Sequence, residues 1–280
     1  MDPVAPGAPD LSHQTRPEDL LLGVRSVSKS FGSIRALVDV DFELRADEIV
    51  AVVGDNGAGK STMVKILSGV YPPDDGTVLV RDQEIRFRSP ADAYANGIAT
   101  VFQDLALVEA LDVARNVFLG REPSRFGIVE RREMDRETVG VFTTFGINVP
   151  SISRTVALLS GGQRQGVAIA RAVLRGGAAV IMDEPTAALG VRETAHVLDI
   201  VRKLRDQGRG VVVVSHNLEL VFDVADRIHV MRLGRTAGVR EATRTDHAEI
   251  VSLIMGAKAG TAMAGGPPAA GPAAAGGPPS

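Results

Sequence analysis

Residues 54–61 have the types and spacing of a loop that binds phosphate groups. They are Gly54, Asp55, Asn56, Gly57, Ala58, Gly59, Lys60 and Ser61, and Thr62 follows them. Glycines permit backbone angles and close approaches that a Cβ would block, so consecutive N–H groups can converge on phosphate oxygens. The Lys60 ammonium suits the β and γ phosphates, and the Ser61 hydroxyl can bind Mg²⁺. A glycine-rich turn with an incidental lysine is the alternative interpretation.

The flanks of this loop favour the phosphate-binding interpretation. An apolar, largely β-branched run over 48–53 is typical of a strand that is buried on both faces. Residues 62–69 predict a short helix that is closed by Gly69. A strand, a glycine loop and a helix in this order are the context that such a loop requires, so we expect a nucleoside triphosphate as ligand.

Two carboxylates follow a second apolar strand, predicted over 178–183. Asp183 is expected to hold Mg²⁺, and Glu184 is expected to polarise the water that attacks the γ-phosphate. Two adjacent acids directly after a buried strand are costly unless they are paired or bind a metal. The sequence therefore predicts a catalytic role for Glu184 and a metal-binding role for Asp183.

Polar residues also end two further predicted strands. Gln103 follows the strand expected over 97–102, and His216 follows the run of valines at 211–214. The amide of Gln103 can reach Mg²⁺ or the attacking water, although on spacing alone it could equally be a surface residue. A single histidine at a strand end is more often structural. Because open parallel sheets place ligands at the carboxyl ends of their strands, we expect both residues to serve catalysis.

A second anion site is predicted at the start of a helix. It comprises Ser160, Gly161, Gly162 and Gln163. Ser160 and Gln163 form a capping-box pattern ahead of apolar residues at helical spacing, so backbone N–H groups are presented at the helix N-terminus. The same residues could also merely begin a helix.

Phe31 is one of few aromatic residues and lies in a polar segment beside Gly32. Its ring could stack on a nucleobase. Taken alone, the residue is better explained as a core phenylalanine beneath a turn.

The remaining elements position these residues. An edge strand is expected over 20–24, and an alternating, half-exposed strand over 38–44. Residues 77–80 and 84–87 predict a hairpin around Asp82 and Gln83. The pattern indicates an α/β fold with an antiparallel β part.

From about residue 104 to residue 160 helical periods replace strands, which predicts a helical subdomain inserted into the sheet domain, itself spanning 20–256. Residues 1–19 are expected to be a disordered leader. Residues 257–280, which are mostly Ala, Gly and Pro, are expected to be a flexible tail.

Composition excludes several classes of protein. A net charge of −3 gives no basic field for nucleic acid or anionic lipid. The absence of cysteine excludes a disulfide framework and a thiolate nucleophile. No apolar run approaches the ~18–20 residues that span a bilayer, so work at a membrane would require another chain.

In this order, these residues resemble the ATP-binding subunit of ABC transporters, a P-loop NTPase fold with an antiparallel β subdomain and an inserted helical subdomain. Gly54 to Ser61 match the Walker A loop, Gln103 the Q-loop glutamine, and residues 159–163 the LSGGQ signature. Asp183 ends the Walker B match, Glu184 matches the catalytic glutamate, and His216 the switch histidine. Phe31 falls where the family has an adenine-stacking aromatic residue.

The resemblance implies ATP and Mg²⁺ as cofactors and two copies facing head to tail. Each ATP would lie between Walker A of one copy and the signature of the other, in a dimer expected to be a homodimer. Residues 88–90, 97–105 and 116–123 look like those of importers of simple sugars, such as ribose, xylose and fructose. Membrane permease subunits would then hold the chain at the cytoplasmic face of the membrane. An extracytoplasmic sugar-binding protein would be an indirect partner, and nucleic acid would not be a partner.

One motif departs from the family pattern. Where Asp usually ends Ser-Ala-Leu-Asp, this chain has Gly190, which bears on contacts across the dimer. Three alternatives stay open: an importer ATPase for another small solute, a soluble ABC-type ATPase without a permease, and a nucleotide-binding regulator without turnover.

Overall fold

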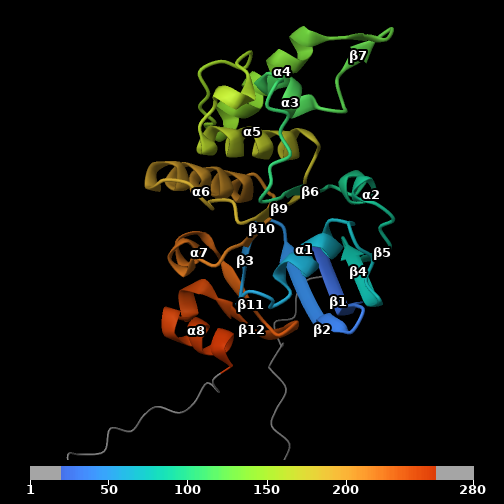
Figure 1. Ribbon diagram of the computed structural model, residues 1–280, viewed down its shortest axis with the longest axis vertical. Coiled ribbons are helices and arrows are strands. Elements are labelled where there is room, and N and C mark those ends of the chain that lie inside the picture. Colours follow the sequence, from blue (N-terminus) through green and yellow to red (C-terminus); the bar gives the residue numbers. More distant parts are fainter. Residues whose placement is uncertain (1–19, 257–280) are drawn as a thin grey trace, which may run out of the picture.

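The structure, a computed structural model, describes residues 20–256. The leader expected over 1–19 and the tail expected over 257–280 lie outside the described residues. A six-stranded sheet runs through the middle of the molecule, with a four-stranded antiparallel sheet beside it and a group of helices above it (Figure 1).

The central sheet has the strand order β12-β11-β3-β10-β9-β6. Its strands are β3 (Ile49–Val53), β6 (Ile98–Val101), β9 (Ala179–Asp183), β10 (Gly210–Val214), β11 (Arg227–Arg232) and β12 (Arg235–Glu241). All neighbours pair in parallel except β11 and β12. The predicted strands around β3, β9 and β10 are confirmed, and β3 and β10 are buried throughout because both faces of the sheet are covered.

The second sheet has the order β2-β1-β4-β5 and contains β1 (Leu20–Phe31), β2 (Ile34–Arg45), β4 (Asp75–Val80) and β5 (Gln83–Ile85). The prediction of an edge strand over 20–24 is wrong, because β1 pairs with β2 on one side and β4 on the other. The predicted hairpin is confirmed, but it turns at Arg81 and Asp82, one residue earlier than expected. Both have positive φ, as a tight two-residue hairpin turn requires.

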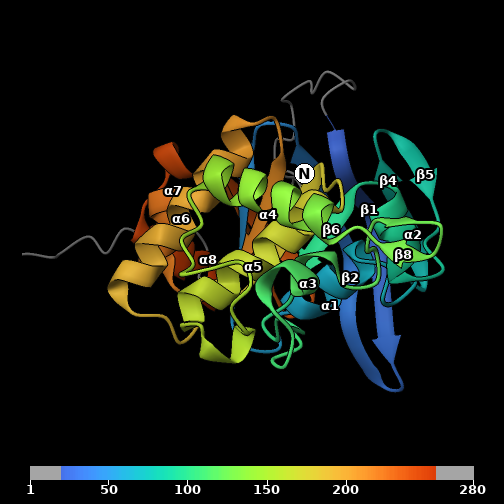
Figure 2. The same ribbon diagram turned by 90° about the horizontal axis from the view of Figure 1, so that it is seen from above.

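Helices pack on both faces of the central sheet. They are α1 (Lys60–Leu67), α2 (Pro90–Ala95), α3 (Val113–Phe118), α4 (Arg131–Phe145), α5 (Gly161–Leu174), α6 (Val191–Asp206), α7 (Leu218–Val224) and α8 (His247–Met255). Short 3₁₀ turns occur at Val156–Leu158 and Ala242–Arg244. A small hairpin of β7 (Ser124–Arg125) and β8 (Ile128–Val129), which the sequence pattern did not predict, lies between α3 and α4. Figure 2 shows α2 and the β4–β5 hairpin on one side of the molecule.

The core divides according to the two faces of the central sheet. Val211 and Val213 pack into the cluster beneath α5 and α6, whereas Val212 and Val214 pack with α1 and the antiparallel sheet. This division follows from the two-residue period of a strand. Among residues 20–256, no helix is both long and apolar enough to cross a bilayer.

Candidate functional site

The phosphate-binding loop joins β3 to α1 in a conformation that depends on glycine. Gly54 has φ of 149° and Gly59, the N-cap of α1, has φ of 102°. A Cβ on Gly54 would overlap the carbonyl oxygen of Met231, and one on Gly59 would lie 2.7 Å from the carbonyl oxygen of Ala36. Because the loop runs this close to its neighbours, a residue with a side chain would be strained at Gly54 or Gly59.

The Lys60 side chain lies over this loop. Its Nζ donates hydrogen bonds to the carbonyl oxygens of Gly54, at 2.6 Å, and Asp55, at 3.0 Å. Burial lowers the pKa of Lys60, against the opposing charges of Glu184, Asp55 and Asp183. The ammonium group is therefore held in place by carbonyl oxygens rather than by a carboxylate, and it can accept an anionic partner.

Asp183 ends β9 and is half-buried. Burial raises the pKa of its carboxyl, with the Glu184 charge adding to this effect and the charges of Lys60 and Lys65 opposing it. Within the described part of the chain its carboxylate makes neither a hydrogen bond nor an ion pair. A carboxylate without a partner at this position suits a bound cation.

Glu184 and His216 form a direct contact. Glu184 has φ of 49°, and its N–H donates to the carbonyl oxygen of Val214 at 2.9 Å, so the residue turns from β9 toward the end of β10. Its Oε1 atom lies 2.8 Å from Nδ1 of His216. The imidazole is 74% exposed, whereas the carboxylate is only 17% exposed. The histidine thus orients a glutamate that retains limited access to water.

The strand order brings four of the predicted residue groups to one edge. Strands β3, β10, β9 and β6 are consecutive neighbours, and the loop, His216, Asp183–Glu184 and Gln103 follow their carboxyl ends. A cavity of about 340 Å³ has both His216 and Gly54 to Asn56 in its lining. Gln103 is exposed, and no hydrogen bond joins it to the other described residues.

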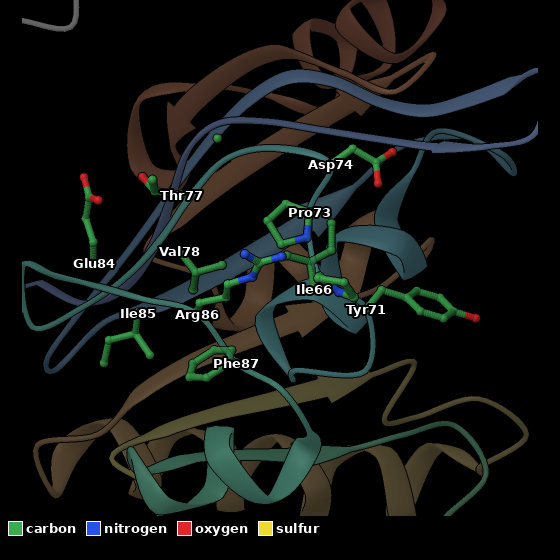
Figure 3. Close-up of a pocket in the computed structure, with 12 residues that line it drawn as sticks. Ile66, Tyr71, Pro73, Asp74, Thr77, Val78, Glu84, Ile85, Arg86 and Phe87 are labelled. Atoms are coloured by element: carbon green, nitrogen blue, oxygen red, sulfur yellow. The ribbon is translucent and has the colours of Figure 1, made fainter.

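Phe31 ends β1 and is 42% exposed, so its interpretation as a core residue is wrong. Its ring meets that of Tyr71 edge-on, with 5.3 Å between centroids, and Lys29 lies over it at 5.8 Å. Sequence reasoning missed Tyr71, although its place four residues after α1 could have indicated it. Tyr71 also borders a cavity of about 330 Å³ that has Arg86 in its lining, but neither Phe31 nor the phosphate-binding loop lines that cavity (Figure 3).

The capping box at the start of α5 is confirmed. Gln163 N–H donates to Oγ of Ser160 at 3.3 Å, and Ser160 N–H donates to Oε1 of Gln163 at 3.0 Å. A Cβ on Gly162 would lie 2.8 Å from Cγ of Glu193, so the helix start packs closely on α6. Helices α5 and α1 belong to different core clusters on the two faces of the central sheet, and in Figure 1 α5 lies above the sheet and α1 beside it. One chain therefore does not gather Ser160 with the groups at the sheet edge.

The sheet order and the grouped strand ends agree with a known family. A family model described as ABC transporter matches residues 37–187. The chain belongs to the ABC transporter family. It is an ATP-binding, ABC-type ATPase, and the fold and family that its motifs predicted are confirmed.

Several relatives of this ABC ATPase are named for sugar import. It is 44% identical to the fructose import ATP-binding protein FrcA of Rhizobium meliloti, over 86% of this chain and 96% of that protein. It is 42% identical to the xylose/arabinose import ATP-binding protein XylG of Sulfolobus acidocaldarius, over 84% and 93%. The ribose import ATP-binding protein RbsA of Chromobacterium violaceum is 44% identical, but this chain spans only 47% of its length.

Solved structures support the fold. The ADP-bound ATP-binding cassette MJ1267 of an ABC transporter aligns with a TM-score of 0.74 over 85% of this chain and 96% of its own, at 24% identity. The dimeric cassette MJ0796 bound to ADP and phosphate aligns with a TM-score of 0.68 over 79% and 99%, at 26% identity.

Proposed function

We propose that this chain is the ATP-hydrolysing subunit of a membrane importer for a monosaccharide. The observation that carries the hydrolytic part is the contact between Glu184 and His216 at the same sheet edge as the phosphate-binding loop. The import part is supported by relatives named for fructose and for xylose/arabinose import, which this chain matches over nearly their whole length.

Each residue at the edge has a separate task in this proposal. Backbone N–H groups of 54–62 and the Lys60 ammonium bind the triphosphate. Glu184 accepts a proton from the attacking water, and His216 keeps its carboxylate oriented through Nδ1. Gln103 approaches the same water from β6. Phe31 stacks on the adenine, with Tyr71 supporting its ring.

The residues present fit Mg²⁺. We propose that Ser61, Asp183 and Gln103 hold it, since this ion usually takes one or two carboxylates together with substrate phosphates. The unpaired, half-buried carboxylate of Asp183 supports this assignment. When bound, Mg²⁺ would neutralise the charge that develops on the phosphate oxygens.

The second half of each ATP site comes from another copy in this proposal. The start of α5 presents the N–H groups of Gly161 and Gly162 and the hydroxyl of Ser160, whereas the capping box uses the N–H groups of Ser160 and Gln163. We therefore propose a head-to-tail homodimer in which ATP joins the two copies and hydrolysis releases them. The dimeric form of the relative MJ0796 supports association of this kind.

The proposed domain extends over 20–256, with a helical subdomain over 104–160 that receives a helix of the membrane permease near residues 104–111. The packing of α3 and α4 against α5 supports this subdomain. The permease would hold the chain at the cytoplasmic face of the membrane, and a sugar-binding protein would act from the other side.

Reconstitution with a sugar permease and its binding protein tests the proposal. We expect phosphate release to rise when the binding protein carries its monosaccharide, and to be absent with Glu184→Gln. ATP hydrolysis without any complex with a permease would favour a soluble ABC-type ATPase. Stimulation by another solute only would contradict the monosaccharide assignment.

A further inference from the structure

A second polar cavity, of about 540 Å³, lies away from the ATP site. The turn of the β4–β5 hairpin, the end of α2, the segment after α3 and the end of α5 surround it. Arg81, Arg121 and Arg175 line it, and no carboxylate does. Its volume is within the range of small-molecule sites.

Two of the three arginines have no side-chain acceptor in the part of the chain that the structure describes. The side chains of Arg81 and Arg121 are exposed, and neither makes a hydrogen bond or an ion pair within residues 20–256. Some other arginines of the chain pair closely with acids, as Arg227 does with Glu48 at 2.9 Å. Unpaired guanidinium groups gathered around one cavity leave their fork-shaped sets of donors available.

Arg175 is fixed at the base of the cavity. Its Nη2 donates to the carbonyl oxygen of Leu119 at 2.7 Å, and its guanidinium lies over the ring of Tyr94 at 5.1 Å. Its Nε is buried without a hydrogen-bond partner. Leu119 caps α3, so attraction to the carbonyls of a helix end explains Arg175. It does not explain Arg81 and Arg121, whose side chains donate to no carbonyl oxygen within residues 20–256.

The positive charge here is not balanced locally. Burial lowers the pKa of Arg171, one turn before Arg175 on α5, and the charge of Arg175 lowers it further. The guanidinium of Arg171 donates to the carbonyl oxygens of Leu105 and Ala106 and meets no carboxylate in the described chain. An anion in the cavity would relieve this repulsion.

We propose that this cavity binds the phosphate group of a small phosphomonoester, such as a sugar phosphate. A phosphomonoester carries close to two negative charges at pH 7 and accepts paired hydrogen bonds from guanidinium groups. The cavity has room for an organic part beyond the phosphate, and the amide of Gln83 lines it. The ligand would connect the β4–β5 hairpin, through Arg81, to the helices, through Arg121 and Arg175.

Calorimetric titration of the full chain with a pentose 5-phosphate tests the proposal. Saturating ADP is present so that the phosphate-binding loop is filled. We expect the double variant Arg81→Gln/Arg121→Gln to weaken binding at least about tenfold, since two charge-assisted donors are lost. Both side chains are exposed, so the fold should be retained. Arg86→Gln, an exposed arginine that lines the other cavity, serves as the matched control and should bind as the parent does.

Inorganic phosphate and phosphatidic acid vesicles are titrated in parallel to distinguish the sources of the phosphate. Tighter binding of the pentose phosphate, lost only in the double variant, supports the proposal. No binding of the pentose phosphate at millimolar concentration, or equal binding by the double variant, overturns it. Preference for the vesicles would assign the cavity to a lipid headgroup and overturn the sugar-phosphate assignment.

Discussion

The Nδ1 atom of His216 lies 2.8 Å from the Oε1 atom of Glu184, and the two residues follow neighbouring strands of the central sheet. A neutral imidazole that donates from Nδ1 to this carboxylate leaves the second carboxylate oxygen free for water. In the proposed mechanism the pair therefore acts as one unit, in which the histidine orients the base that the hydrolytic reaction requires.

Replacing either member of this pair should impair hydrolysis more than binding. Glu184→Gln should keep ATP affinity and lower phosphate release by roughly 10²-fold or more, as expected for loss of a general base. His216→Ala should also lower phosphate release. The double variant should lose little beyond Glu184→Gln alone, because the histidine acts through the glutamate. Additive losses would show that His216 has a role independent of Glu184.

Lys60→Ala should weaken ATP binding. The ammonium lies over the loop at 2.6 Å from the carbonyl oxygen of Gly54, and loss of a charged donor costs about 2–3 kcal/mol, or roughly 30- to 150-fold in Kd. Calorimetry measures this directly. Lys65→Ala removes the same charge from the same helix, but its Nζ lies over the Tyr71 ring at 5.6 Å. It should lose far less affinity, and equal losses would contradict the role given to Lys60.

Asp183→Asn should stabilise the nucleotide-free protein. Burial and the Glu184 charge raise the pKa of Asp183, so its ionised form destabilises the fold above the ordinary pKa of aspartate. This penalty is lost as pH falls and the carboxyl is protonated. We expect a gain of about 0.5–1 kcal/mol in unfolding free energy at pH 7, which shrinks toward zero near pH 3. Denaturant titrations at pH 7 and pH 3 measure this change in unfolding free energy, and a loss of stability at pH 7 would refute the prediction.

Ser160→Ala should have two separable effects. Loss of the cap on α5 should cost about 1 kcal/mol of stability. In a Glu184→Gln background it should also prevent the proposed ATP-dependent dimer, which light scattering would measure. Ser89→Ala removes the corresponding cap of α2, whose Oγ accepts from Asp92 N–H at 3.3 Å. That control should lose similar stability and still dimerise; if both variants dimerise, Ser160 does not contact the partner's ATP.

Gly190 can be replaced without backbone strain. It is the N-cap of α6 with φ of −72° and ψ of 170°, and it supplies no side-chain cap. Asn or Asp at position 190 should cap α6 and raise the unfolding free energy by a few tenths of a kcal/mol, which is the usual advantage of these N-cap residues over glycine. A Cβ would lie 2.7 Å from Oε2 of Glu193, a mobile atom but a negative charge. Thermal unfolding should therefore rank Gly190→Asn above Gly190→Asp, and the reverse order would contradict this account.

Predictions that rest on a few adjacent residues agree with the structure. The strand, loop and helix around Lys60 and the capping box of Ser160 and Gln163 involve contacts between residues at most six apart. Such contacts depend on local backbone geometry, which residue types determine directly. The turn at Arg81 and Asp82 was placed one residue too late because turn propensity alone did not define the register with β5.

Only the tertiary structure decided which strands are neighbours and which charged residues from distant parts of the sequence lie together. The contact between Glu184 and His216 spans 32 positions in sequence and exists because β9 and β10 pair in parallel, with Val214 opposite Asp183. The interior place of β1 likewise depends on its pairing with β4, more than fifty residues away. The three arginines of the second cavity come from separate elements, and no periodic pattern relates them. Sequence alone determined the local elements and the residues able to bind a triphosphate, because these depend on neighbouring residues. Pairing across long loops, which depends on the packing of the whole core, decided which of those residues meet.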